Sequence, residues 1–152
     1  MTPVLQSGPA IEPLSLIEAK NWLRIDHGDD DVLILALLTA ARLVIEAHTQ
    51  LLLIEQSWRL ILDKWPQQCP LTIPLRPLIS LDAIRVADAD GASILVPPQN
   101  YLLSLTPQMP RLHFSKNPPA SGIPLSGIEM DVTAGFGPAA ADVPAELIQA
   151  IR

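Results

Sequence analysis

The end of the chain, residues 130–151, has the sequence MDVTAGFGPAAADVPAELIQAI. The alternation of apolar and polar residues that is typical of a strand stops at Gly135 and Gly137. After a short loop, Pro144 begins a helix at a position where its missing N–H costs nothing. The apolar residues of that helix share one face: Leu147, Ile148 and Ile151. Because a helix of about two turns is marginal by itself, we expect it to be stabilised by docking onto another chain.

The composition indicates a protein with more apolar surface than a soluble monomer needs. Of 152 residues, 49% are apolar and only 17% are charged, whereas the ordinary charged share is about 25%, and the mean hydropathy is +0.30. The longest apolar run, Val32 to Leu38, has seven residues, against the roughly 20 that span a membrane. The first residues show no secretory pattern. We therefore expect one domain over 1–152, covered in part by other subunits, with no membrane partner.

The charge distribution argues against tight binding of nucleic acid. The net charge is −6 and the ten Lys and Arg residues are scattered, whereas affinity for DNA or RNA depends mainly on neutralising phosphates. An acidic wall would still suit a channel through which DNA slides without sticking. Cys69 is the one cysteine, so the chain has no internal disulfide and no cysteine-based metal site, which fits the cytosol.

The first 50 residues indicate a flexible arm over 1–13 and two helices over 14–50. Ser15 and Glu18 have the spacing of a capping box, in which the Ser15 hydroxyl and the Glu18 carboxylate bond each other's backbone N–H. The first helix is expected to end at Gly28, since glycine suits a left-handed C-terminal cap.

The second helix is expected from Val32 to Thr49, after the acidic triplet Asp29-Asp30-Asp31, whose charge favours a helix N-terminus. Its first two turns are apolar on every side, which is typical of a buried helix. A polar stripe follows only later, at Thr39, Arg42, Glu46 and Thr49. Two explanations stay open: part of this helix packs against a neighbouring subunit, or it is a central helix wrapped by the protein's own sheet.

The sequence of residues 51–137 is typical of short strands separated by prolines and glycines. Asp88-Ala89-Asp90-Gly91 is a hairpin turn with glycine where a positive φ is needed, and residues 115–127 form an expected mobile loop. Residues 143–152 are expected to form the start of a final helix. Strands are expected at 58–63, 71–78, 80–87, 94–96, 101–105, 111–114 and 128–133. The predicted class is α+β, with an N-terminal helix pair, a small antiparallel β-sandwich or barrel, and a C-terminal helix.

This order of elements resembles the head–tail connector, or adaptor, proteins of long-tailed bacteriophages, prophages and gene transfer particles. The likeness covers nearly the whole chain and consists of scaffold patterns. It is carried by Pro13-Leu14-Ser15-Leu16-Ile17-Glu18-Ala19-Lys20-Asn21-Trp22-Leu23-Arg24-Ile25, Val32-Leu33-Ile34, Ala40-Ala41-Arg42, Ile45-Glu46, Trp58, Leu60, Ile73-Pro74-Leu75-Arg76-Pro77-Leu78, Val132-Thr133-Ala134-Gly135-Phe136-Gly137 and Val143-Pro144-Ala145-Glu146-Leu147-Ile148-Gln149-Ala150-Ile151.

The resemblance implies a structural protein of the virion neck, assembled in the bacterial cytoplasm. Such proteins form a ring, usually of twelve copies, beneath the portal protein. The ring leads to the tail or stopper protein and extends the channel through which DNA passes as cargo. A ring needs heterologous contacts between copies. The expected interface residues are Leu33, Leu37 and Val44, at the core or the subunit contact, and Pro144, Leu147, Ile148 and Ile151, towards the portal.

Other candidate sites fail on spacing, so we expect no catalytic, cofactor or metal site. The three adjacent carboxylates of Asp29–Asp31 do not converge on one ion, and Asp88-x-Asp90-Gly91 lacks the later ligands of a calcium loop. Gly135-Phe136-Gly137 lacks the lysine of a phosphate loop. His27, His48 and His113 have no zinc spacing, and Cys69 has no evident histidine partner.

An alternative function is a β-sandwich module that binds a sugar or a peptide. Such a module needs exposed aromatic side chains, but the chain has only two Phe, three Trp and one Tyr. For Trp22, Trp58 and Trp65, a place in the core is favoured over a place at an interface.

Overall fold

The computed structural model describes residues 1–67 and 70–152, which divide into two compact units. The helix unit consists of Pro9–Glu55 and Gly135–Arg152. The strand unit consists of Met1–Gly8 and Gln56–Ala134. Cys69 lies outside the described residues.

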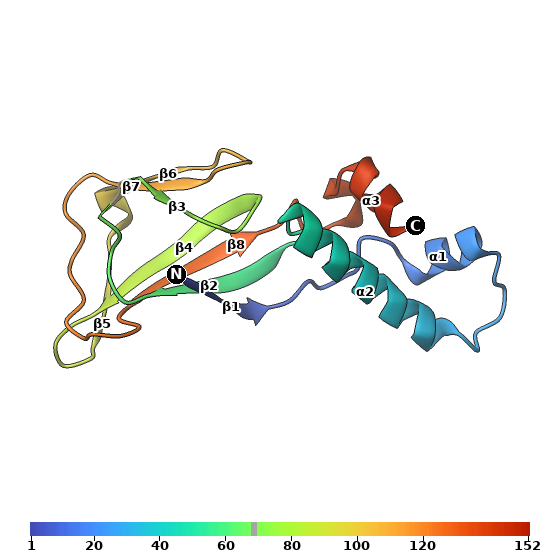
Figure 1. Ribbon diagram of the computed structural model, residues 1–152, viewed down its shortest axis with the longest axis horizontal. Coiled ribbons are helices and arrows are strands. Elements are labelled where there is room, and N and C mark those ends of the chain that lie inside the picture. The colour runs from blue at the N-terminus through green and yellow to red at the C-terminus, as the bar shows by residue number, and fades with distance from the viewer. Residues whose placement is uncertain (68–69) are drawn as a thin grey trace. The chain divides into compact units, whose positions relative to one another are not determined.

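The larger sheet of the strand unit is antiparallel and has β8 at its centre (Figure 1). Alternate residues of β8 face the core, as the period-2 pattern of its sequence predicts. In the described residues its strands are, in spatial order, β1 (Thr2–Ser7), β2 (Gln56–Leu62), β8 (Ile128–Ala134), β4 (Leu78–Ala87) and β5 (Ser93–Leu95).

A smaller antiparallel sheet completes the strand unit. Within the described residues it has the order β3 (Leu71–Thr72), β7 (Arg111–Phe114) and β6 (Tyr101–Ser104), with a short 3-10 turn η1 (Pro98–Asn100) before β6. The β4–β5 hairpin turns at Gly91, whose φ of 80° confirms the predicted glycine position. The strands expected from the sequence are thus present within a few residues of their predicted bounds, except for the one expected at 71–78, of which only Leu71–Thr72 form a strand. Pro74 and Pro77 follow, and a proline cannot donate a hydrogen bond to a sheet.

The first residues differ from expectation. We expected a flexible arm over 1–13, but Thr2–Ser7 form strand β1 at the edge of the larger sheet, paired with β2. All six of its side chains are exposed. Because no face of β1 is buried, its sequence shows no alternation by which a strand could be predicted. Pro3 is compatible with this place because an edge strand tolerates a missing donor.

The segment 115–127 has no helix or strand, as predicted, and hydrogen bonds tie it to the strand unit. Gly122 N–H donates to Ala87 O at 2.8 Å, and Ser126 N–H donates to Asp63 Oδ1 at 2.6 Å. A Cβ on Gly122 would lie 2.2 Å from the backbone nitrogen of Ala89. Glycine is therefore required at this close approach; mobility of the loop stays a prediction.

The helix unit contains α1 (Leu16–Leu23), α2 (Asp31–Thr49), the 3-10 turn η2 (Ala140–Asp142) and α3 (Ala145–Ile151). The predicted capping box of α1 is confirmed: Glu18 N–H donates to the Ser15 hydroxyl at 3.2 Å, and Ser15 N–H donates to the Glu18 carboxylate at 3.0 Å. The Ser15 hydroxyl also donates to the Glu18 carboxylate at 2.6 Å, and this bond, together with the one from the Ser15 N–H, holds the pKa of Glu18 below its usual value. Pro144, predicted as the first helical residue of α3, is its N-cap, so the helix begins one residue later than predicted, at Ala145.

The end of α1 was predicted wrongly. The helix stops at Leu23, and Arg24 adopts the left-handed conformation that we had assigned to Gly28, with φ of 59°. Ile25 N–H donates to Lys20 O at 3.0 Å, which is the bond of a Schellman cap. The apolar pattern continued to Ile25 because Ile25 packs against the core after the helix has ended.

The chain enters the helix unit for the second time at Gly135, which has φ of 135°. A Cβ there would lie 2.5 Å from the carbonyl oxygen of Ile54. Only glycine fits this approach, so the predicted break of the last strand is confirmed. Together the two units confirm the α+β class, with the helix pair near the beginning and the last helix at the end.

Candidate protein interface

The inward face of α2 is a stripe of residues four apart. Ile34 and Leu38 are buried in a core shared with Leu14 and Ala19. One and two turns later the stripe becomes charged, because Arg42 and Glu46 are only 5% and 9% exposed. A charged residue is almost never buried unless it is paired.

Ion pairs and hydrogen bonds hold this buried charge within the helix unit. Arg42 Nε donates to Glu12 Oε2 at 2.8 Å, and Arg42 Nη1 donates to Glu46 Oε2 at 2.9 Å. The Thr39 hydroxyl donates to Glu12 at 2.9 Å, and Leu53 N–H donates to the second oxygen of Glu46 at 2.9 Å. The network connects α2 with the segments on both sides of it in the sequence, and so sets which face of α2 points inward.

The outward side of α2 is aliphatic. Leu33, Leu37 and Val44 are 57%, 58% and 56% exposed, which excludes the core position that we had left open for them. The polar stripe was expected along α2, but its charged members Arg42 and Glu46 lie on the inward face. A surface helix normally has the opposite arrangement. The helix therefore presents an aliphatic surface that its own chain leaves uncovered.

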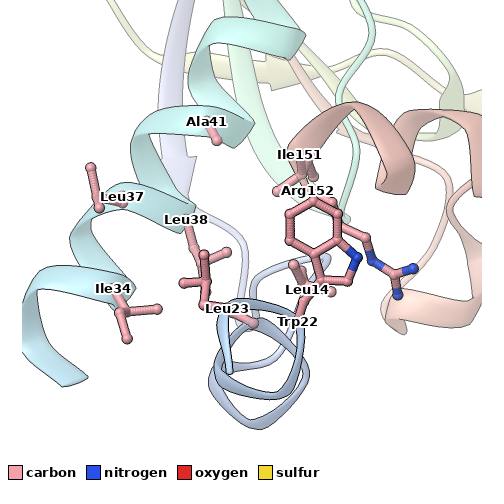
Figure 2. A pocket seen from close by; sticks show the side chains of 10 residues that line it. Leu14, Trp22, Leu23, Ile34, Leu37, Leu38, Ala41, Ile151 and Arg152 are labelled. Atoms are coloured by element: carbon pink, nitrogen blue, oxygen red, sulfur yellow. The ribbon is translucent and has the colours of Figure 1, made fainter. Parts of the chain in front are cut away.

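A groove of about 310 Å³ runs along this helix (Figure 2). Figure 2 shows Ile34, Leu37 and Leu38 of α2 on one side, with Trp22 near Ile151 and Arg152 on the other. Trp22 is 58% exposed, so its expected place in the core is wrong. The full lining is Leu14, Ala19, Trp22, Leu23, Ile34, Leu37, Leu38, Ala41, Ile151 and Arg152.

The residues expected to face the portal are partly buried within the helix unit. Leu147, Ile148 and Ile151 pack against a core cluster of Leu53, Ile54 and Val143. Pro144 is also partly buried. The aliphatic side of α3 thus stabilises the fold, and the side of α3 that solvent reaches is formed by Ala145, Glu146, Gln149 and Ala150.

By length and composition alone, α2 is apolar enough to cross a membrane. Its inward face nevertheless carries Arg42 and Glu46, which are bonded within a folded unit. A protein partner therefore accounts better for its outward aliphatic side.

A second charged group lies across three strands of the larger sheet. Arg59 of β2 donates to Asp131 Oδ1 of β8 at 2.7 Å, and Arg85 of β4 donates to the other carboxylate oxygen. Glu129 lies 3.1 Å from Arg59. Burial alone would raise the pKa of the Asp131 carboxyl, but the hydrogen bonds from Arg59 and Arg85 outweigh it and lower that pKa.

The substitution Asp131→Asn is expected to remove an acid-dependent part of the stability. Because the pKa of Asp131 is lowered in the folded state, its contribution is complete above about pH 5 and disappears as the pH falls below about 4. Urea unfolding should show wild type more stable than the variant at pH 7, with the difference shrinking towards pH 3. Asp90→Asn, in the exposed β4–β5 turn, is the control. A difference that does not change with pH would contradict the assignment.

Two carboxylates rejected above as metal ligands, Asp31 and Asp88, bond other groups of the protein. Asp31 is paired with Lys20 at 2.6 Å, while Asp30 is the N-cap residue but makes no side-chain cap bond. Asp88 accepts the backbone N–H of Asp90 and Ala92, as in an Asx turn. Among the described residues, no three His, Cys, Asp or Glu side chains form a group that could hold a metal ion.

Two aromatic residues of the strand unit, Trp65 and Tyr101, contact a third, Phe114. The rings of Trp65 and Phe114 meet edge to face with centroids 4.8 Å apart, and Trp65 Nε1 donates to Pro119 O at 2.8 Å. The ring of Tyr101 also meets that of Phe114 edge to face, with centroids 6.3 Å apart. These contacts supply no exposed aromatic platform of the kind that a sugar-binding module uses.

No protein-family model matches the sequence, and no curated protein matches it. A chain in the neck of an empty gene transfer agent (GTA) particle, computed with C6 symmetry, has 29% identity and a TM-score of 0.85 over 99% of this chain and 80% of that chain. A chain in the virion of a native GTA particle has 29% identity and a TM-score of 0.79 over the same shares. A chain in the neck of a native GTA particle, computed with C12 symmetry, has 30% identity and a TM-score of 0.71 over 97% of this chain and 78% of that chain.

The similarity to these neck chains supports a structural component of a virion neck. The expected family is confirmed. The chain belongs to the head–tail connector family of phages and phage-like particles.

Proposed function

We propose that the protein is the adaptor of a phage-like particle neck. Twelve copies form a ring that joins the portal to the tail or stopper protein and lengthens the DNA channel. Membership of the connector family supports this role, as do the C6 and C12 symmetries with which the similar necks were computed. The proposed location of the protein is the particle neck. The particle is proposed to assemble in the bacterial cytoplasm.

The observation that carries the proposal is the outward side of α2. Leu33, Leu37 and Val44 are more than half exposed, while Arg42 and Glu46 of the same helix are buried. Exposing aliphatic side chains costs about 25 cal/mol for each Å² that a partner could cover. In a protein that works as a monomer nothing offsets this cost. In a ring, the neighbours on both sides can cover these side chains.

The charges suit a channel that DNA passes through without binding. The net charge of −6 repels phosphates. Arg59 and Arg85, which could attract them, are paired with Asp131 and Glu129 on the same sheet. DNA is therefore proposed as cargo and not as a ligand.

The portal contact is proposed at α3, where Leu147, Ile148 and Ile151 were expected to attach. Because these three side chains also pack within the helix unit, changing them would test folding as well as binding. The exposed Ala150 is on the same helix and can be altered with little effect on the core.

The substitution Ala150→Arg is expected to weaken co-purification with the portal protein by about tenfold or more, because a bulky charge at a packed contact costs at least about 1.4 kcal/mol. Ala92→Arg, at an exposed position of the strand unit, is the matched control. Thermal unfolding of both variants should match that of wild type. If wild type does not bind the portal, the adaptor role is wrong; if Ala150→Arg binds as well as the control, α3 is not the attachment.

A further inference from the structure

We propose that α2 packs against two neighbouring copies at once, through two different aliphatic edges. This inference rests on the proposed ring. The groove edge consists of Leu33, Leu37 and Val44. The far edge consists of Val32 and Leu43.

Both edges are exposed and they lie on different sides of the helix. The far-edge residues Val32 and Leu43 are 82% and 53% exposed. At about 100° per residue, the centres of the two edges are about 110° apart around the helix axis. Three small residues separate them, all exposed: Ala36, Ala40 and Ala47. The outward surface of α2 therefore has two aliphatic ridges with an alanine strip between them.

A closed ring of identical copies has heterologous contacts. Each copy must use one surface towards the next copy and a different surface towards the previous one. Two distinct edges on one helix supply both halves of a heterologous contact.

The two edges also complement each other in shape and charge. The groove edge borders the hollow lined by Trp22, Leu23 and Leu37, whereas Val32 is a protruding side chain. Helices pack with the ridges of one in the grooves of the other. The positively charged Arg152 lines the groove. The negatively charged Asp29, whose side chain is 94% exposed, precedes Val32 of the far edge by three residues. The far edge of one copy is thus matched to the groove edge of the next.

Disulfide trapping tests this pairing, because it captures transient contacts and needs no stable ring. In a Cys69→Ser background, Leu43→Cys places a thiol on the far edge and Leu37→Cys places one on the groove edge. Mixing the two proteins under mild oxidation should give mixed dimers, while each variant alone gives none. A chain that carries both changes should give a ladder of cross-linked oligomers.

Leu102→Cys is the control, because Leu102 is similarly exposed but lies on β6 of the strand unit. It should give no cross-link with either partner beyond the background of random collision. Cross-links within one single variant would show a two-fold contact and overturn the inference, and absence of the mixed cross-link would overturn it as well. If portal binding is retained while the mixed cross-link is absent, only this inference fails; a mixed cross-link without portal binding removes the adaptor role instead.

Discussion

Replacing Arg42 with Met is expected to lower the free energy of unfolding of the helix unit by about 3–5 kcal/mol, the cost of breaking a buried ion pair by removing one partner. Arg42 is 5% exposed and holds the carboxylates of Glu12 and Glu46. Methionine fills a similar volume, so the loss is electrostatic and does not come from a cavity. Without the guanidinium, two carboxylates stay close together in a place that water hardly reaches.

Urea unfolding, followed by far-ultraviolet circular dichroism, measures this effect. Arg111→Met is the matched control, because Arg111 is exposed on β7, and surface substitutions of this kind usually change stability by less than about 0.5 kcal/mol. Adding Glu12→Gln to Arg42→Met should recover part of the loss, since it removes one uncompensated charge. A loss below about 1 kcal/mol for Arg42→Met would mean that the network does not set the orientation of α2.

The substitution Leu37→Asp is expected to weaken ring formation by about 100-fold or more, because a charge buried at an aliphatic contact costs at least about 2.7 kcal/mol. Leu37 is 58% exposed, so the isolated protein should fold as wild type does. Ring formation is measured by sedimentation and electron microscopy, with the portal protein present as a template.

Ile94→Asp is the control for Leu37→Asp. Ile94 is also exposed, at 49%, but it lies on β5 of the strand unit. Both variants should have the circular dichroism spectrum of wild type, and only Leu37→Asp should lose the rings. Equal assembly of the two variants would remove α2 from the subunit contact.

The elements whose signals are local could be predicted from the sequence. The capping box depends on two residues three apart, Ser15 and Glu18, and the hairpin turn on a glycine at position 91. Strands β2 and β8 alternate because one face of each is buried in the strand unit. In each case the residues that form the signal are also the residues that form the structure.

The orientation of α2 could not be predicted, because its sequence is consistent with two opposite arrangements. Arg42 and Glu46 form a polar stripe that normally marks the solvent side. They point inward because Glu12, 30 residues before Arg42, completes the charge network. No pattern within the helix contains that information. For the same reason β1 was missed, since its partner β2 lies some fifty residues away.

The candidate interface was predicted in part. Leu33, Leu37 and Val44 were chosen because α2 has more aliphatic residues than one core needs, and all three are exposed. The choice of α3 followed the resemblance to connector proteins. The sequence alone did not show that Leu147 and Ile148 are needed by the helix unit's own core, and Trp22 gave no sign that it borders a groove.

A reconstruction of the assembled neck at side-chain resolution tests the central claim most directly. We expect Leu33, Leu37 and Val44 of each copy to lie within about 4.5 Å, the distance of apolar contact, of aliphatic side chains from a neighbouring copy in the ring. Outward sides of α2 that face solvent, the DNA channel or only the portal would contradict it.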